Sequence, residues 1–141
     1  MKMCGGVEYS HHGEFIKAFF PNPKAALPVK TRAGSLSLIP WGRRDVQAGK
    51  LPKGGWARLE SIHKGVWDKY RPIPVKIVVE RFMEKDNQGT SHWFDLDKNS
   101  FIQGLLVKSE NEQRVYVVTV SPDDKQAIHD RWPRIISHVS E

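Results

Sequence analysis

Alternating apolar and polar positions dominate the second half of the chain. Val75, Ile77 and Val79 alternate with Lys76 and Glu80, and the pattern predicts one strand over residues 74–84. On that strand Glu80, Phe82 and Glu84 would share a face. The same alternation predicts three further strands, over residues 92–96, 101–107 and 114–120. Short polar turns join these segments, so we expect antiparallel pairing.

The first half of the chain gives a more mixed pattern. Shorter alternating segments predict strands over residues 7–9, 26–29 and 35–39. Residues 14–20 predict one or two helical turns, ended by the proline that follows. Residues 58–68 carry apolar side chains near helical spacing, although Gly65 falls among them. Residues 43–57 contain three glycines and a proline, which predicts a loop.

The end of the chain predicts a helix from Ser121 to about Asp130. Ser121 is a suitable N-cap, a proline follows at the first helical position, and two acidic residues occupy the first turn. With 141 residues, the chain has the length of one domain with a real core. We therefore expect a single α+β domain over residues 1–141, with a mainly antiparallel, curled or barrel-like sheet and a few short helices.

Composition excludes several classes of protein. Cys4 is the only cysteine, so neither an internal disulfide framework nor a multi-cysteine zinc site can form. No apolar run approaches the 18 residues of a membrane span, and no secretory signal follows Lys2. We expect a cytoplasmic monomer with no membrane partner and no bound metal.

Positive charge is concentrated in the first part of the chain. Residues 1–85 carry a net charge of +9 and residues 86–141 a net charge of −3. A basic stretch includes Arg43, Arg44 and Arg58, and it is accompanied by Trp41 and Trp56. Cations for phosphates beside aromatic faces for unstacked bases are typical of single-stranded nucleic-acid binding. The alternative is a solvated basic loop whose two tryptophans face the core.

The first residues carry a second candidate chemistry. If translation begins at Met3, removal of that methionine leaves Cys4 with a free α-amine and a thiol on adjacent carbons. The amine can condense with an aldehyde to an imine, and the thiol can then close a thiazolidine ring. The α-amine has a reference pKa of about 7.7–8.0, so a useful fraction is nucleophilic at neutral pH. The alternative is an unstructured chain end with an idle thiol.

Six short segments also match the motifs of one protein family in the correct order. They are Met3-Cys4-Gly5, Pro23 with Leu27-Pro28-Val29, Leu38-Ile39-Pro40, Trp56-Ala57-Arg58-Leu59-Glu60-Ser61, Phe82-Met83-Glu84 and Ile128-His129-Asp130-Arg131-Trp132-Pro133. Through these segments the chain resembles the SOS-response-associated peptidase (SRAP) family, the abasic-site-processing proteins of the DNA damage response. The resemblance covers roughly residues 3–136.

The resemblance implies a β-rich fold with a basic groove for single-stranded DNA that contains abasic sites. It implies that Cys4 captures the abasic-site aldehyde as a thiazolidine, in a covalent DNA–protein cross-link. Glu84 would move protons to and from the amine and the sulfur, and His129 would protonate the sugar oxygen to favour ring opening. Arg58 would contact phosphates. The expected DNA-binding residues are Pro23, Trp41, Arg43, Arg44, Trp56 and Arg58, and no metal or organic cofactor is needed. A protein bound to DNA in this way would be nucleoid-associated.

Several positions depart from the family pattern. Trp56 replaces an asparagine that would hold the open sugar, Gly6 replaces an arginine, and Lys85 replaces an aromatic residue. The chemistry also requires that residues 1–3 be removed, or that translation begin at Met3. Two alternatives therefore stand beside the cross-linking or lyase activity: an inactive single-stranded nucleic-acid-binding module, and a self-processing peptidase (a hydrolase) that exposes Cys4. Without the resemblance, Glu84 would be a surface carboxylate and His129 a helix-end cap.

Overall fold

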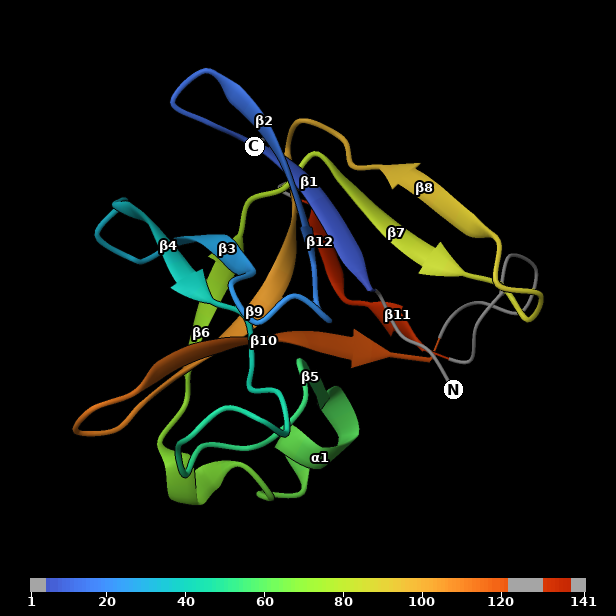
Figure 1. The fold of residues 1–141 in the computed structure, drawn as a ribbon. Helices are drawn as coiled ribbons and strands as arrows, with labels where there is room; N and C mark the ends of the chain where they lie inside the picture. The colour runs from blue at the N-terminus through green and yellow to red at the C-terminus, as the bar shows by residue number, and fades with distance from the viewer. Residues whose placement is uncertain (1–4, 122–130, 138–141) are drawn as a thin grey trace.

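The computed structural model describes residues 5–121 and 131–137, which fold into two β-sheets (Figure 1). The smaller sheet has four antiparallel strands in the order β2-β1-β7-β8. Their bounds are β1 Gly6–His11, β2 Glu14–Phe19, β7 Arg81–Lys85 and β8 Ser91–Asp95. The first hairpin turns through His12 and Gly13, which both have positive φ, as a type I′ turn requires.

The larger sheet has eight strands, six of them in the order β11-β10-β9-β6-β3-β4. β12 pairs with β9, and β5 runs parallel to β10 while the other pairs are antiparallel. The bounds are β3 Ala26–Lys30, β4 Leu36–Pro40, β5 Trp56–Arg58, β6 Ile73–Ile77, β9 Ser100–Lys108, β10 Gln113–Val120, β11 Trp132–Pro133 and β12 Ile135–Ser137.

The larger sheet curls until its two sides meet. Trp41, just after β4, forms a parallel bridge with Val115 of β10, and the Gly42 N–H donates to the Val115 carbonyl over 2.8 Å. Gly42 has a φ of 56°, and a Cβ there would lie 2.1 Å from the Gly54 carbonyl oxygen. Only glycine fits this close approach of two backbones. The expected curled, mainly antiparallel sheet is therefore confirmed.

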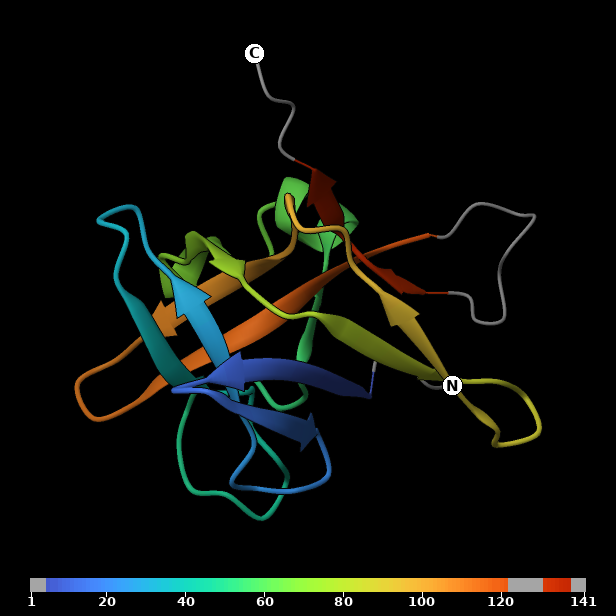
Figure 2. The ribbon, with the colours of Figure 1, turned by 90° about the horizontal axis from the view of Figure 1, so that it is seen from above.

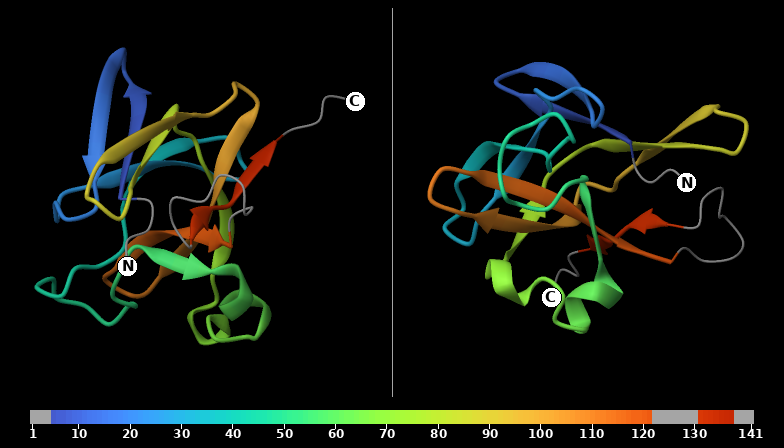
Figure 3. Two further views of the ribbon diagram at one scale, coloured as in Figure 1. Left: turned by 90° about the vertical axis from the view of Figure 1, so that its right-hand side faces the viewer. Right: turned by 60° about the horizontal axis from the view of Figure 1, so that its bottom comes forward.

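Two hydrophobic clusters fill the molecule on either side of β10. The main cluster lies between the two sheets and includes Val7, Leu27, Phe82 and Val117. The second cluster, around Tyr116, lies under α1 (Leu59–His63) and the 3₁₀ turn η1 (Asp68–Tyr70). Figures 1 and 3 show α1 on the side of β10 away from the β1–β2 hairpin. The few short helices thus cover one face of a sheet-dominated fold.

Three predicted elements differ from the structure. Residues 14–20 do not form helical turns, because 14–19 pair along their whole length with β1. The helix predicted over 58–68 is confined to α1, since Gly65 follows with a φ of 82° and the chain then enters η1. The helix predicted after Ser121 lies outside the described residues.

The strand predicted over residues 74–84 is broken in two. β6 ends at Ile77 and β7 begins at Arg81, and the chain crosses from the larger sheet to the smaller one between them. The Val78 N–H donates to Pro28 of β3, and the Glu80 N–H donates to Glu8 of β1. Glu80 therefore does not share a strand face with Glu84.

Candidate functional site

Glu84 is the one buried carboxyl residue among those that the structure describes. It lies on β7 and is 0% exposed, and burial raises its pKa to about 8. Glu84 is thus not the surface carboxylate of the alternative interpretation. A carboxyl group that titrates near neutrality can both donate and accept a proton in one reaction cycle, which is what general acid–base catalysis needs.

The strand that carries Glu84 is fixed from two directions. On β7, Glu84 is two residues from Phe82, so the two side chains leave the same face of the sheet. The Phe82 ring packs against Phe94 of β8 and Trp132 of β11, with ring centroids 5.3 Å and 5.1 Å away. Glu84 therefore points to the same side as an aromatic cluster that joins the smaller sheet to β11.

The beginning of the described chain is hydrogen-bonded to the same strand. The Gly5 N–H donates to the Met83 carbonyl over 3.0 Å, and the Phe20 N–H donates to the Gly5 carbonyl over 3.1 Å. The residue that follows Cys4 is therefore held beside the residue that precedes Glu84. Cys4 itself lies outside the described residues, as does His129.

Arg131 is a buried arginine that joins the segment before β11 to α1, and the sequence alone indicated no role for it. Arg131 is 3% exposed, and its guanidinium donates twice to the Glu60 carboxylate, over 2.8 Å and 2.9 Å. It also donates to the Thr119 carbonyl over 2.7 Å. The hydrogen bonds from Arg131 lower the pKa of Glu60 to about 2. The only signal was the position of Arg131 inside the motif that ends at Pro133.

Arg58 and Arg131 both contact Thr119 of β10. Arg58 ends β5, where it pairs with Thr119 of β10, and its side chain is exposed. Thr119 thus touches both Arg58, through the sheet, and Arg131, through hydrogen bonds. Trp132 follows Arg131 and packs on Phe82 of β7. These contacts connect β5 and β10 to β7 through Arg131 and Trp132, and we call the region that they join, from Arg58 to Glu84, the β7–β10 site.

Trp56 and Trp41 pack on the core. Trp41 is 0% exposed and its Nε1–H donates to the Gly55 carbonyl, so it has no free face for a nucleic-acid base. Trp56 is half-buried, with its ring 4.7 Å from Phe20 and 6.2 Å from Trp41. The expectation that Trp41 stacks on DNA is wrong, because its ring fills the barrel where the sheet closes.

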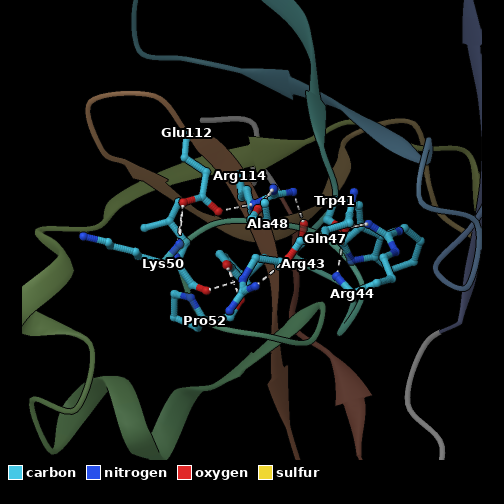
Figure 4. A network of polar contacts seen from close by, with 12 residues as sticks. Trp41, Arg43, Arg44, Gln47, Ala48, Lys50, Pro52, Glu112 and Arg114 are labelled. Atoms are coloured by element: carbon cyan, nitrogen blue, oxygen red, sulfur yellow. Dashed lines mark hydrogen bonds and ion pairs between the residues drawn. The ribbon is translucent and has the colours of Figure 1, made fainter.

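Arg43 and Arg44 serve the loop that contains them (Figure 4). Arg43 donates to the carbonyls of Leu51 and Gln47, each over 2.7 Å. Arg44 is 8% exposed and donates to the Phe20 and Trp41 carbonyls, while its guanidinium lies 4.0 Å from the centre of the Phe20 ring. Burial, with the nearby charge of Arg114, lowers the pKa of Arg44. Arg44 is therefore a structural residue, and its predicted contact with DNA is not possible in this conformation.

The other side of the same loop is held by hydrogen bonds to an ion pair at the start of β10. Arg114 donates to Glu112 over 2.7 Å and to the Gly42 carbonyl over 2.9 Å (Figure 4). The Glu112 carboxylate also accepts the Lys50 N–H over 2.9 Å. Burial tends to raise the pKa of Glu112, but these hydrogen bonds and the charge of Arg114 lower it overall. Of the predicted DNA contacts, Pro23 and Arg58 are exposed.

Within residues 5–121 and 131–137, the acidic and histidine side chains form no group of three that could hold a metal ion. No described helix is long and apolar enough to cross a bilayer. The chain was compared with known proteins as well. No protein-family model matches the sequence, and no curated protein matches it significantly.

Proposed function

We propose that this protein binds single-stranded DNA and captures abasic sites as a thiazolidine on Cys4. One observation carries the proposal: Glu84, a fully buried carboxyl with a pKa of about 8, lies on the strand to which the beginning of the chain is hydrogen-bonded. The resemblance of six ordered segments to the SRAP family supports the same function. The proposal needs residues 1–3 to be absent from the active form.

The chemistry balances without a cofactor. The Cys4 amine adds to the aldehyde carbon of the ring-opened abasic sugar, and loss of water gives an imine. The thiol then adds across that imine, which forms the C–S bond and restores a secondary amine. The sum is one thiazolidine and one water. Proton transfers accompany each step, and a carboxyl poised near pH 8 can take a proton from the incoming amine and return it to the departing hydroxyl.

The other residues of the β7–β10 site have supporting roles. Arg58 is exposed at the end of β5, where a phosphate of the bound strand can pair with it. Arg131 cannot take that role, because its guanidinium is fully engaged with Glu60 and Thr119. It acts instead as a positioning residue, two positions after His129, the proposed acid for sugar ring opening.

The test combines an intact mass with a cross-linking assay. The mass shows whether residues 1–3 are removed, and single-stranded DNA with one abasic site is then incubated with the protein and analysed on a denaturing gel. We expect a covalent adduct that Cys4→Ala abolishes and that Glu84→Gln slows by about 10²-fold. Glu80→Gln is the matched control, since Glu80 is an exposed glutamate just before the same strand. An adduct that forms equally well in the Cys4→Ala variant would refute the proposal.

The inactive binding module is the alternative that a specific observation favours. Trp56 stands where the family has an amide, and its ring packs on Phe20 and Trp41. A tryptophan cannot hold an open sugar through paired donor and acceptor atoms, because indole has a single N–H donor. An inactive binding module would give a salt-sensitive shift on native gels, weakened by Arg58→Ala, with no adduct on denaturing gels.

A further inference from the structure

A second basic region lies at the other end of the molecule. A cavity of about 440 Å³ opens between η1, the loop at residues 50–51 and the end of β9. Four cationic side chains line it, and we call it the basic pocket. They are Lys50, Lys69, Arg71 and Lys108. A cavity of this volume is in the range that holds small ligands or the parts of larger ones.

The cations of the basic pocket are not paired with carboxylates of the described residues. All four cations are exposed, and none forms an ion pair with a described residue. The described lining includes no carboxylate; its remaining members are Leu51, Tyr70, Ile73 and Ser109. The Lys69 ammonium lies 5.3 Å from the centre of the Tyr70 ring. Four like charges around one cavity repel one another, so an anion there would be strongly favoured.

The backbone at Arg71 adds a second observation. Arg71 has φ 50° and ψ 55°, the left-handed conformation that usually selects glycine at the end of a helical turn. A residue with a side chain is strained there, and such strain is concentrated at functional positions. A strained arginine that lines the basic pocket therefore supports a functional role for this pocket.

The basic pocket is separate from the β7–β10 site. Figures 1 and 2 show the turn between β9 and β10 and the C-terminal end of β7 at opposite ends of the molecule. An occupant of the pocket is thus not the group that reacts near Glu84. Four cations exceed the charge of one phosphate group, so several phosphates are needed to match them. Flexible lysines with few neutral donors contact a phosphate backbone without reading bases.

We propose that the basic pocket binds successive backbone phosphates of a nucleic-acid strand, independently of any abasic site. The inference goes beyond the proposed cross-linking and does not depend on it, because an undamaged strand contains the same phosphates. The bound strand would have two anchors, one at Arg58 and one in the pocket.

The experiment measures the affinity of the full chain for an undamaged, fluorescently labelled single-stranded DNA by anisotropy, over a series of salt concentrations. Each lost phosphate contact lowers the slope of log K against log salt by about 0.7. We expect the double variant Lys69→Ala/Lys108→Ala to lower the slope by about 1.4 and the affinity at 0.1 M salt more than tenfold. Lys30→Ala/Lys98→Ala is the matched control, with two exposed lysines outside the pocket.

Arg71→Gly separates binding from folding. Glycine relieves the left-handed strain, so this variant should melt at or above the temperature of the natural protein, while its salt slope falls by about 0.7. Equal slopes for the pocket variants and the control would overturn the inference. The inference would also be overturned if the pocket bound only a free nucleoside triphosphate or inorganic phosphate. In that case these ligands would stabilise the protein, while the pocket variants would bind DNA normally.

Discussion

At the scale of single residues, the protonation state of Glu84 sets the charge of the β7–β10 site. Burial is the cause of the raised pKa of Glu84, because a charged carboxylate in the core loses its hydration. At pH 7 most molecules therefore hold a neutral Glu84, whereas in an unfolded chain the same group is ionised. At neutral pH the buried Glu84 therefore lowers the free energy of unfolding, and such destabilisation is common where a residue has a functional role.

The first prediction follows from this difference in pKa. The unfolded group releases its proton near pH 4.5 and the folded group near pH 8, so between these values the folded state binds more protons. The contribution of Glu84 to stability is thus most favourable below pH 4.5 and falls as the pH rises to 8. We expect Glu84→Gln to remove this dependence, on the order of 3 kcal/mol across the window. Urea denaturation at pH 5 and pH 8 measures it, and parallel pH profiles for both proteins would contradict it.

The roles of individual residues could be predicted only in part from the sequence. The alternation over 75–79 and the match at Phe82-Met83-Glu84 place Glu84 on a strand, but no local pattern shows that Trp132 packs on the face of that strand from which Glu84 projects. The sequence shows the charge of Arg44 and the aromatic ring of Trp41 but not the groups that they contact, so both fit the pattern of DNA-binding residues. Their hydrogen bonds go to backbone carbonyls of Phe20 and Gly55, which no spacing rule predicts.

At the scale of elements, two buried arginines tie loops and short strands to the barrel. Arg131 joins the segment before β11 to α1 through Glu60, and Arg114 joins the loop after β4 to β10. Both arginines are buried and each makes several hydrogen bonds. A buried guanidinium that loses its carboxylate is left poorly compensated, so these pairs matter to the elements that they join.

The second prediction concerns the Glu60–Arg131 pair. The pKa of Glu60 is lowered to about 2, mainly by the hydrogen bonds from Arg131. Its stabilising effect is present above the unfolded value near pH 4.5 and is lost as the pH falls toward 2. We expect Glu60→Gln to lower the melting temperature at pH 7 and to have little effect at pH 2. Thermal melts at the two pH values test this, and an equal drop at both would show that the charge is not the cause.

The third prediction concerns the loop that holds Lys50. A Cβ at Gly49 would lie 2.2 Å from a Glu112 carboxylate oxygen, and that carboxylate accepts the Lys50 and Leu51 N–H groups. We expect Glu112→Ala to release this part of the loop, with faster amide exchange at Lys50 and Leu51 while the β9–β10 ladder stays protected. Hydrogen exchange measures both. Unchanged exchange at Lys50 would mean that other contacts hold the loop.

Most of the strands could be predicted from the sequence, but the structure at residues 14–20 and at 78–80 could not. Alternation located the strands that became β3, β4, β8, β9 and β10. Residues 14–20 were mistaken for helical turns because Phe15 and Phe19, four positions apart, fit a helix as well as one face of a strand. The pairing with β1 decides between the two, and His12-Gly13 was the overlooked turn signal. The break at 78–80 results from a change of sheet, which local sequence does not encode.

At the scale of the whole molecule, closure of the barrel is concentrated at one point. Gly42 brings the end of β4 against both Val115 and Gly54, where side chains have no room. The sequence predicted a curled sheet, but the strands that meet at this closure are more than 70 residues apart in the chain, beyond the reach of local pattern.

The fourth prediction tests this closure. Gly42→Ala adds a Cβ against backbone atoms at a φ of 56°, so it should destabilise the fold by more than about 3 kcal/mol. Gly34→Ala is the matched control: its φ is 88°, but a Cβ there meets nothing within 4 Å, so only the conformational cost of about 1 kcal/mol applies. Urea denaturation of both variants gives the comparison. Equal losses would show that backbone strain alone limits these positions.

The parallel pairing of β5 with β10 also has a consequence for how the protein reaches its native state. Hairpins such as β1–β2 and β9–β10 join near neighbours and can form early, whereas Trp56 meets Val117 only after a long intervening segment has folded. β5 is therefore expected to join the sheet late and, as a three-residue strand, to leave it early during local opening. Since β5 ends at Arg58, the phosphate contact proposed for Arg58 would be completed only in the last stage of folding, and it would be the first part of the proposed DNA-binding surface to be lost on local opening.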